Sequence, residues 1–303
     1  MTQIIIHEVG PRDGLQMERE VVPIETKEDW IRRAMESGVD IVQVGSFVHP
    51  VKVPQMADTD ELIRRLVGNK RPGATIAGLA LNERGVERGL ECGVEMLCLG
   101  ASASETHSLR NTGMATMEAL RRIIVAAEQA VAAGKKVQVS VQSAFGCGFE
   151  GPVPEARVLE MVGAYVEAGL FNISLADTAG HAHPAQVERL FDAVFDLEPG
   201  IDCTCHFHNT YGLGMANIMA AMRVGVTSFE TSFAGLGGCP FTKVAAGNVA
   251  TEDFVNALQM EGLRRDVNVN KLMDVASDVA KYFEREMPGC VYKAGLIHKQ
   301  VAA

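Results

Sequence analysis

Short apolar runs alternate with longer amphipathic stretches along most of the chain. The runs are rich in Val, Ile, Leu and Phe and have the length of buried strands. The stretches between them carry apolar residues at helical spacing, for example over residues 119–136 and 156–169. The expected strands cover residues 3–10, 40–47, 75–81, 95–102, 136–145, 171–178, 202–209 and 228–235.

The amphipathic stretch over residues 26–38 carries signals for both ends of a helix. Thr26 precedes Asp29 by three residues, which is the spacing of a capping box at a helix N-terminus. Gly38 stands where a residue with left-handed backbone angles usually ends a helix. We therefore expect this helix to begin after Thr26 and to end at Gly38.

The alternation of strands and helices predicts parallel βα units. Eight such units close naturally into a (β/α)8 TIM barrel. The alternative is an open doubly wound sheet, which a glycine-rich phosphate-binding turn after the first strand would favour. Residues 10–16 read GPRDGLQ, which is not such a turn. The sequence thus predicts an α/β fold, with residues 1–303 forming one catalytic TIM-barrel domain and residues from about 265 adding C-terminal helices.

Composition narrows the class of protein further. The chain has 303 residues, 47% of them hydrophobic, and a net charge of −10, which argues against a nucleic-acid partner. No apolar run reaches the roughly 18 residues of a membrane helix, and the N-terminus lacks the basic region of a signal peptide. The seven cysteines are odd in number and scattered in spacing, which is typical of reduced thiols, and the lack of a CxxC pair argues against a structural zinc knuckle. We expect a cytoplasmic protein with no membrane partner, and core positions for Cys92, Cys98, Cys203 and Cys205.

Unusual polar residues stand where the expected strands end, which is where TIM barrels carry out their chemistry. His206 and His208 alternate along one strand, so both side chains point the same way and could bind one metal ion. Asp13 follows the first strand and adds a carboxylate, and this donor set suits a catalytic divalent metal. No soft ligand is obligatory here, so Mg²⁺, Mn²⁺ and Zn²⁺ all stay open. The alternative is a pair of packed histidines.

Two other charged residues at strand ends, Arg12 and Asp177, each allow two interpretations. Arg12 could stabilise an oxyanion that develops during a reaction, or it could pair with the neighbouring Asp13 at the surface. Asp177 could orient a ligand or a histidine, or it could cap the next helix.

The segment GLGGC, residues 235–239, follows the last expected strand. Its glycines permit a tight structural turn or a lid that closes over a ligand. A thiol at Cys239 on such a lid could donate or accept a proton.

Six segments together resemble the 3-hydroxy-3-methylglutaryl-CoA lyase family, in the family's order and over nearly the whole chain. The glycine–cysteine segment is the most specific of them, whereas the RDG and HxH motifs are shared with isopropylmalate synthases and related metal-dependent barrels. The segments read EVGPRDGLQ (8–16), SFVHPVKVPQM (46–56), GASASETHSLRN (100–111), SLADTAG (174–180), HFHNTYGLGMAN (206–217) and GLGGCPFTKVAAGNVATED (235–253).

This resemblance implies a role for individual residues. It implies metal binding by Asp13, His206, His208 and the side-chain oxygen of Asn248. It also implies that Arg12 steadies the enolate of acetyl-CoA.

The resemblance implies roles outside the metal ligands as well. Cys239 is similar to the family's loop cysteine, which transfers a proton, and His206 is the alternative base if the metal does not fully occupy it. Asp177 is similar to an aspartate near the substrate, and Glu252 to a glutamate that supports the loop. The segment ending at Asn111 is similar to one near the acyl-CoA.

Two positions depart from the family pattern. Gln43 replaces a glutamate in the second strand, and Asn209 replaces an aspartate after the HxH motif. Each change removes a negative charge near the expected site and raises the question of which acyl group is bound.

The resemblance implies a metal-dependent lyase that cleaves 3-hydroxy-3-methylglutaryl-CoA to acetyl-CoA and acetoacetate, as in leucine degradation, in a homodimer. The first alternative is a lyase for a related acyl-CoA such as citramalyl-CoA. The second is a Claisen-type synthase, although the chain is short for one. The third is a silent barrel that only binds acyl-CoA or metal.

Overall fold

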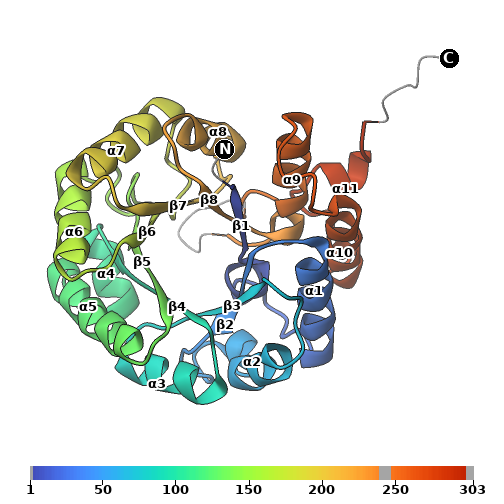
Figure 1. The fold of residues 1–303 in the computed structure, drawn as a ribbon, viewed down its shortest axis with the longest axis horizontal. Coiled ribbons are helices and arrows are strands. Elements are labelled where there is room, and N and C mark those ends of the chain that lie inside the picture. The colour runs from blue at the N-terminus through green and yellow to red at the C-terminus, as the bar shows by residue number, and fades with distance from the viewer. Residues whose placement is uncertain (1–2, 239–246, 298–303) are drawn as a thin grey trace.

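The computed structural model describes residues 3–238 and 247–297, and every structural statement below concerns these residues. Eight parallel strands pair in chain order, and β8 pairs with β1, so the sheet closes into a barrel. Helices ring the barrel on the outside (Figure 1). The expected TIM barrel is therefore confirmed. The strands are β1 (Ile5–Glu8), β2 (Ile41–Ser46), β3 (Thr75–Leu79), β4 (Met96–Ser102), β5 (Lys136–Gln142), β6 (Asn172–Asp177), β7 (Asp202–Phe207) and β8 (Ser228–Thr231).

Helices follow the strands in the described part of the chain, and short helical turns mark several strand ends. The turns that matter for the site are η1 (Gly10–Gly14), after β1, and η3 (Phe233–Gly235), after β8; η2 (Pro54–Met56) follows β2. The longer helices are α1 (Ile24–Ser37), α2 (Thr59–Val67), α3 (Glu83–Cys92), α4 (Glu105–Thr112), α5 (Thr116–Ala132), α6 (Glu155–Glu167), α7 (Pro184–Leu197), α8 (Gly214–Arg223) and α9 (Thr251–Met260), followed by α10 (Val269–Tyr282) and α11 (Val291–Ala294).

The main core lies between the barrel and its helices. Strand residues such as Val42 and Ile76 are fully buried there, together with helix residues such as Ile31 and Leu62. Burying apolar surface in this layer is the main stabilisation of the fold. The cysteines expected in the core, Cys92, Cys98, Cys203 and Cys205, are buried.

The extra C-terminal helices predicted beyond residue 265 are α10 and α11, and α10 packs beside α1 (Figure 1). Trp30 of α1 joins these elements: its ring centroid lies 5.5 Å from that of Tyr282 and 6.2 Å from that of Phe233. Phe233 belongs to η3, the turn that leads from β8 toward the glycine-rich segment. The C-terminal extension thus supports one border of the site.

Several expected boundaries differ from the structure. Helix α1 begins at Ile24 with Pro23 as its N-cap residue, so the expected start at Thr26 is wrong. Thr26 instead lies in the first turn, where its amide donates to the carbonyl of Pro23. The end at Gly38 is confirmed, with a φ of 112°. Strands β1, β5 and β8 end earlier than expected: the helical turns η1 and η3 follow β1 and β8, and residues 143–145 form a turn after β5. No helix in the described ranges is long and apolar enough to cross a membrane.

Candidate active site

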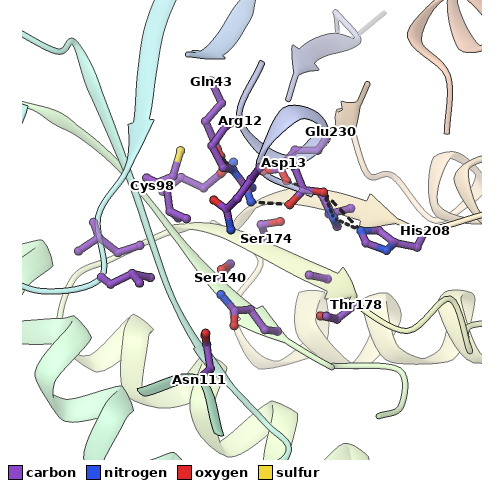
Figure 2. A pocket seen from close by; sticks show the side chains of 18 of the residues that line it. Arg12, Asp13, Gln43, Cys98, Asn111, Ser140, Ser174, Thr178, His208 and Glu230 are labelled. Carbon is purple, nitrogen blue, oxygen red and sulfur yellow. Dashed lines mark hydrogen bonds and ion pairs between the residues drawn. The ribbon is translucent and has the colours of Figure 1, made fainter. Parts of the chain in front are cut away.

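A polar cavity opens at the carboxyl ends of the strands, and residues from around the barrel line it (Figure 2). Arg12 is the one Lys or Arg side chain among its described lining residues; it donates to Asp13, and the carboxylate of Glu230 lines the same cavity. Away from these charges the cavity carries neutral polar groups, including Ser140 and Asn111 (Figure 2). The cavity therefore concentrates its charge on one side.

Asp13, His206 and His208 meet on that charged side. The two imidazole Nε2 atoms lie 3.0 Å apart. The Asp13 Oδ2 atom lies 3.5 Å from Nε2 of His208 and 3.9 Å from Nε2 of His206. One potential ligand atom from each residue lies within 4.8 Å of the others, so the three residues could hold a metal ion.

The electrostatic surroundings keep Asp13 available as an anion. Burial alone would raise its pKa, but the Arg12 guanidinium and the two histidines lower the pKa well below its ordinary value. A carboxylate and two imidazoles form a donor set that suits a divalent cation. The residues therefore fit the metal that the sequence leads us to expect.

Asn248 lies against the same carboxylate. Its side-chain nitrogen donates to Asp13 Oδ2 over 2.8 Å and to the carbonyl of Leu236 over 3.1 Å, while its oxygen is buried and has no hydrogen-bond partner in the described part of the chain. Gly237 permits this close approach, because a Cβ atom there would lie 2.6 Å from the Asn248 nitrogen and the backbone φ is 120°. An unpartnered amide oxygen at this point is compatible with the metal role that the resemblance implies.

Arg12 is held in place by two neighbours. Its Nε atom donates to the side-chain oxygen of Gln43, and its Nη1 atom donates to Asp13. Gln43 therefore accepts a hydrogen bond through a neutral oxygen. Among the residues that the structure describes, Asp13 is the one charged hydrogen-bond partner of the guanidinium.

Asn111 and Asp177, which were also predicted at the site, occupy different places relative to the cavity. Asn111 of α4 lines the far end of the cavity (Figure 2). Asp177 is fully buried and is not among the lining residues; its two oxygens accept from the amides of His181 and Ala182, at 2.8 and 3.0 Å. The structure thus gives Asp177 the contacts of a loop-holding residue before α7.

The glycine-rich segment is described only at its two ends. Gly238 lines the cavity, whereas Cys239 lies outside the described residues. Glu252 is fully buried near the start of α9, and its Oε2 atom accepts from the amide of Ala234 in η3 over 3.1 Å. This contact fits the support role expected for Glu252.

Glu230 of β8 and His7 of β1 join the site without having been predicted. Glu230 Oε2 lies 2.8 Å from Nδ1 of His206, and Glu230 Oε1 lies 3.6 Å from Nδ1 of His7. Burial lowers the pKa of His206, but the hydrogen bond with Glu230 and the charge of Asp13 outweigh it and raise the pKa above its ordinary value. The available signal in the sequence was a titratable residue inside each of two expected strands, His7 in QIIIHEVG and Glu230 in SFETSFAG.

A scan of known protein families places residues 3–279 in the one described as HMGL-like. The chain belongs to the HMGL-like family. Among curated relatives, the hydroxymethylglutaryl-CoA lyase of Bacillus subtilis is 35% identical over 286 residues, which cover 94% of this chain and 95% of the relative. The (R)-citramalyl-CoA lyase of Chloroflexus aurantiacus is also 35% identical, over 100% of this chain and 98% of its own.

A solved structure of an HMG-CoA lyase from Acinetobacter baumannii, in complex with coenzyme A and 3-methylmalate, is similar over most of its length. Its TM-score is 0.91 at 35% sequence identity, and the match covers 98% of this chain and 96% of that one. Family membership and the closed barrel therefore agree with the resemblance seen in the sequence.

Proposed function

We propose that this protein is a metal-dependent lyase that cleaves a carbon–carbon bond in a branched 3-hydroxyacyl-CoA. The first candidate substrate is 3-hydroxy-3-methylglutaryl-CoA, with acetyl-CoA and acetoacetate as products. The observation that carries the proposal is the convergence of Asp13, His206 and His208 beside Arg12 at the strand ends. The relatives named above support the substrate class.

Asp13, His206 and His208 are the residues that would hold the metal, with Asn248 beside them. Once bound, a divalent cation would lower the pKa of the substrate hydroxyl. Mg²⁺ or Mn²⁺ is the first expectation, and Zn²⁺ is compatible with the same residues.

The chain's own residues would carry the other steps. Loss of the hydroxyl proton drives cleavage toward the thioester carbonyl, and His206 is the alternative base for this step only if the metal does not occupy its Nε2 lone pair. Arg12 would stabilise the resulting enolate oxygen with a guanidinium already oriented by Gln43 and Asp13. Cys239 is the proposed proton donor to the enolate carbon. Asp177 would position the loop after β6 near the substrate.

A second substrate candidate is citramalyl-CoA. One specific observation favours it: the citramalyl-CoA lyase of Chloroflexus aurantiacus matches this chain over its full length. The neutral Gln43 beside Arg12 adds support, because the carboxylate of citramalyl-CoA lies one carbon closer to the reacting hydroxyl and would be repelled more by a glutamate at this position. The proposal also includes a single catalytic domain over residues 1–303, a homodimer, a cytoplasmic location and a role in leucine degradation.

A panel of acyl-CoA substrates tests the proposal. The purified protein with Mn²⁺ is incubated with 3-hydroxy-3-methylglutaryl-CoA, with both enantiomers of citramalyl-CoA, and with acetyl-CoA plus a 2-oxo acid. We expect acetyl-CoA from one of the first two substrates. Release of free coenzyme A from acetyl-CoA only when the oxo acid is present would instead identify a condensing synthase, and no turnover of any substrate would contradict the proposal.

A further inference from the structure

Three neighbouring strands place polar side chains at one level of the barrel interior. In the strand pairing, Glu230 of β8 stands opposite His206 of β7 on one side and opposite His7 of β1 on the other. All three side chains are nearly or fully buried, with exposed fractions of 6% for Glu230, 6% for His206 and 0% for His7. Figure 2 shows Glu230 on the same side of the cavity as Asp13 and His208.

The contact between Glu230 and His206 decides which imidazole nitrogen carries the proton. A carboxylate accepts hydrogen bonds, so the Nδ1 atom of His206, 2.8 Å from Glu230 Oε2, must be the protonated one. In the neutral ring, Nε2 then keeps its lone pair. This Nε2 atom of His206 lies 3.0 Å from Nε2 of His208, and it is one of the atoms that could bind the metal.

His208 has no comparable partner. Its Nδ1 atom is buried and has no hydrogen-bond partner among the described residues. None of the described residues therefore selects the tautomer of His208 that leaves its Nε2 atom free. In the described arrangement, the Nε2–H of His208 can donate to Nε2 of His206, which completes a chain of hydrogen bonds from Glu230 through both rings.

We propose that Glu230 is a positioning residue that presets His206, but not His208, for metal binding. This inference rests on the proposed metal site. Carboxylates that accept from a ligating histidine commonly fix its tautomer and ring orientation, and losing them typically weakens metal affinity 10- to 100-fold. His7, whose Nδ1 atom lies 3.6 Å from the other oxygen of Glu230, closes the remaining side of this carboxylate.

The test compares the wild type with Glu230→Gln, which keeps the shape of the side chain and removes its charge. The Kd for Mn²⁺ is measured by electron paramagnetic resonance of the free ion. Imidazole ¹⁵N shifts of the metal-free proteins report the tautomers, and a His206→Asn variant assigns the signals. Glu95→Gln is the matched control: Glu95 precedes β4, pairs with Lys70 over 3.1 Å and is absent from the cavity lining.

We expect a Kd about 10- to 100-fold higher in Glu230→Gln and an unchanged Kd in Glu95→Gln. In the wild type, the spectrum should show His206 protonated at Nδ1, and Glu230→Gln should lose this preference. An unchanged Kd in Glu230→Gln, or a wild-type His206 protonated at Nε2, would overturn the inference. If Glu230→Gln does not fold, the wild-type spectrum alone still decides the tautomer.

The same data separate this inference from the proposed function. A wild type that binds no Mn²⁺ would contradict the metal site and the lyase proposal, whatever the tautomer of His206. A wild type that binds Mn²⁺ and cleaves an acyl-CoA, together with a Glu230→Gln variant of equal affinity, would contradict only the positioning role.

Discussion

Replacing Arg12 by methionine should remove most of the turnover while leaving the fold and the metal site in place. Arg12 is the one Lys or Arg among the described residues that line the cavity, so no neighbouring Lys or Arg there can substitute for it. Removing one donor from an oxyanion site typically lowers kcat 10²- to 10³-fold, which is about 2.7–4 kcal/mol of transition-state stabilisation. We expect a loss in that range for Arg12→Met.

The structure also predicts how a conservative variant behaves. Arg12 contacts Gln43 through Nε and Asp13 through Nη1, and a lysine ammonium cannot reproduce this two-point geometry. Arg12→Lys should therefore recover only part of the loss. Its positive charge should still keep the pKa of Asp13 low.

The assay is steady-state formation of acetyl-CoA at saturating Mn²⁺, with the Kd for Mn²⁺ measured on the same preparations. A kcat within tenfold of the wild type in Arg12→Met would refute the role given to Arg12. A large rise in the Kd for Mn²⁺ that accounts for the lost activity would also refute it, because the residue would then act through the metal site.

Three other changes test separate parts of the site. Cys239→Ser should lower kcat at least about 10²-fold, the usual scale for a general acid or base, with the Kd for Mn²⁺ unchanged; near-normal turnover would assign the thiol another role. Gln43→Glu should shift the ratio of kcat/KM toward 3-hydroxy-3-methylglutaryl-CoA and away from citramalyl-CoA by roughly tenfold, or about 1.4 kcal/mol. The reason is that the carboxylate of citramalyl-CoA lies one carbon closer to the reacting hydroxyl. An unchanged ratio would show that Gln43, in place of the family's glutamate, has no effect on the choice of substrate. Burial raises the pKa of Glu252 from 4.5 to about 8, so its stabilising contribution is complete below pH 4.5 and is lost as the pH rises through 8. The Tm of the wild type should therefore fall more steeply than that of Glu252→Gln between pH 5 and 9, and parallel Tm curves would show that Glu252 does not titrate there.

The sequence predicted the barrel because each of its strands and most of its helices carry a local signal. Alternating apolar runs and amphipathic stretches depend only on neighbouring residues, and eight βα units have few ways to close. The same local rule placed His206 and His208 on one face of their strand. Boundaries were less predictable: Pro23 starts α1 earlier than Thr26 because a proline with extended backbone angles can precede a helix without a side-chain cap.

The residues that the sequence missed depend on contacts between strands that are neighbours in the sheet. Glu230 is 24 positions from His206 in the chain and meets it only because β7 and β8 are neighbours in a given register. His7 meets Glu230 only because the sheet closes between β8 and β1. Asp177 shows the converse. Its position at a strand end left open whether it orients a ligand or a histidine or caps the next helix, and the structure shows its oxygens bound to the amides of the following loop.

The most direct test of the central claim is the dependence of carbon–carbon cleavage on the metal. The protein is stripped with a chelator, dialysed and given 3-hydroxy-3-methylglutaryl-CoA or citramalyl-CoA with and without Mn²⁺, and both products are quantified. We predict no cleavage without metal, and with Mn²⁺ restored equal amounts of acetyl-CoA and of the matching oxo acid, acetoacetate or pyruvate. Full cleavage by the rigorously metal-free protein, or no cleavage of either substrate after metal is restored, would contradict the account.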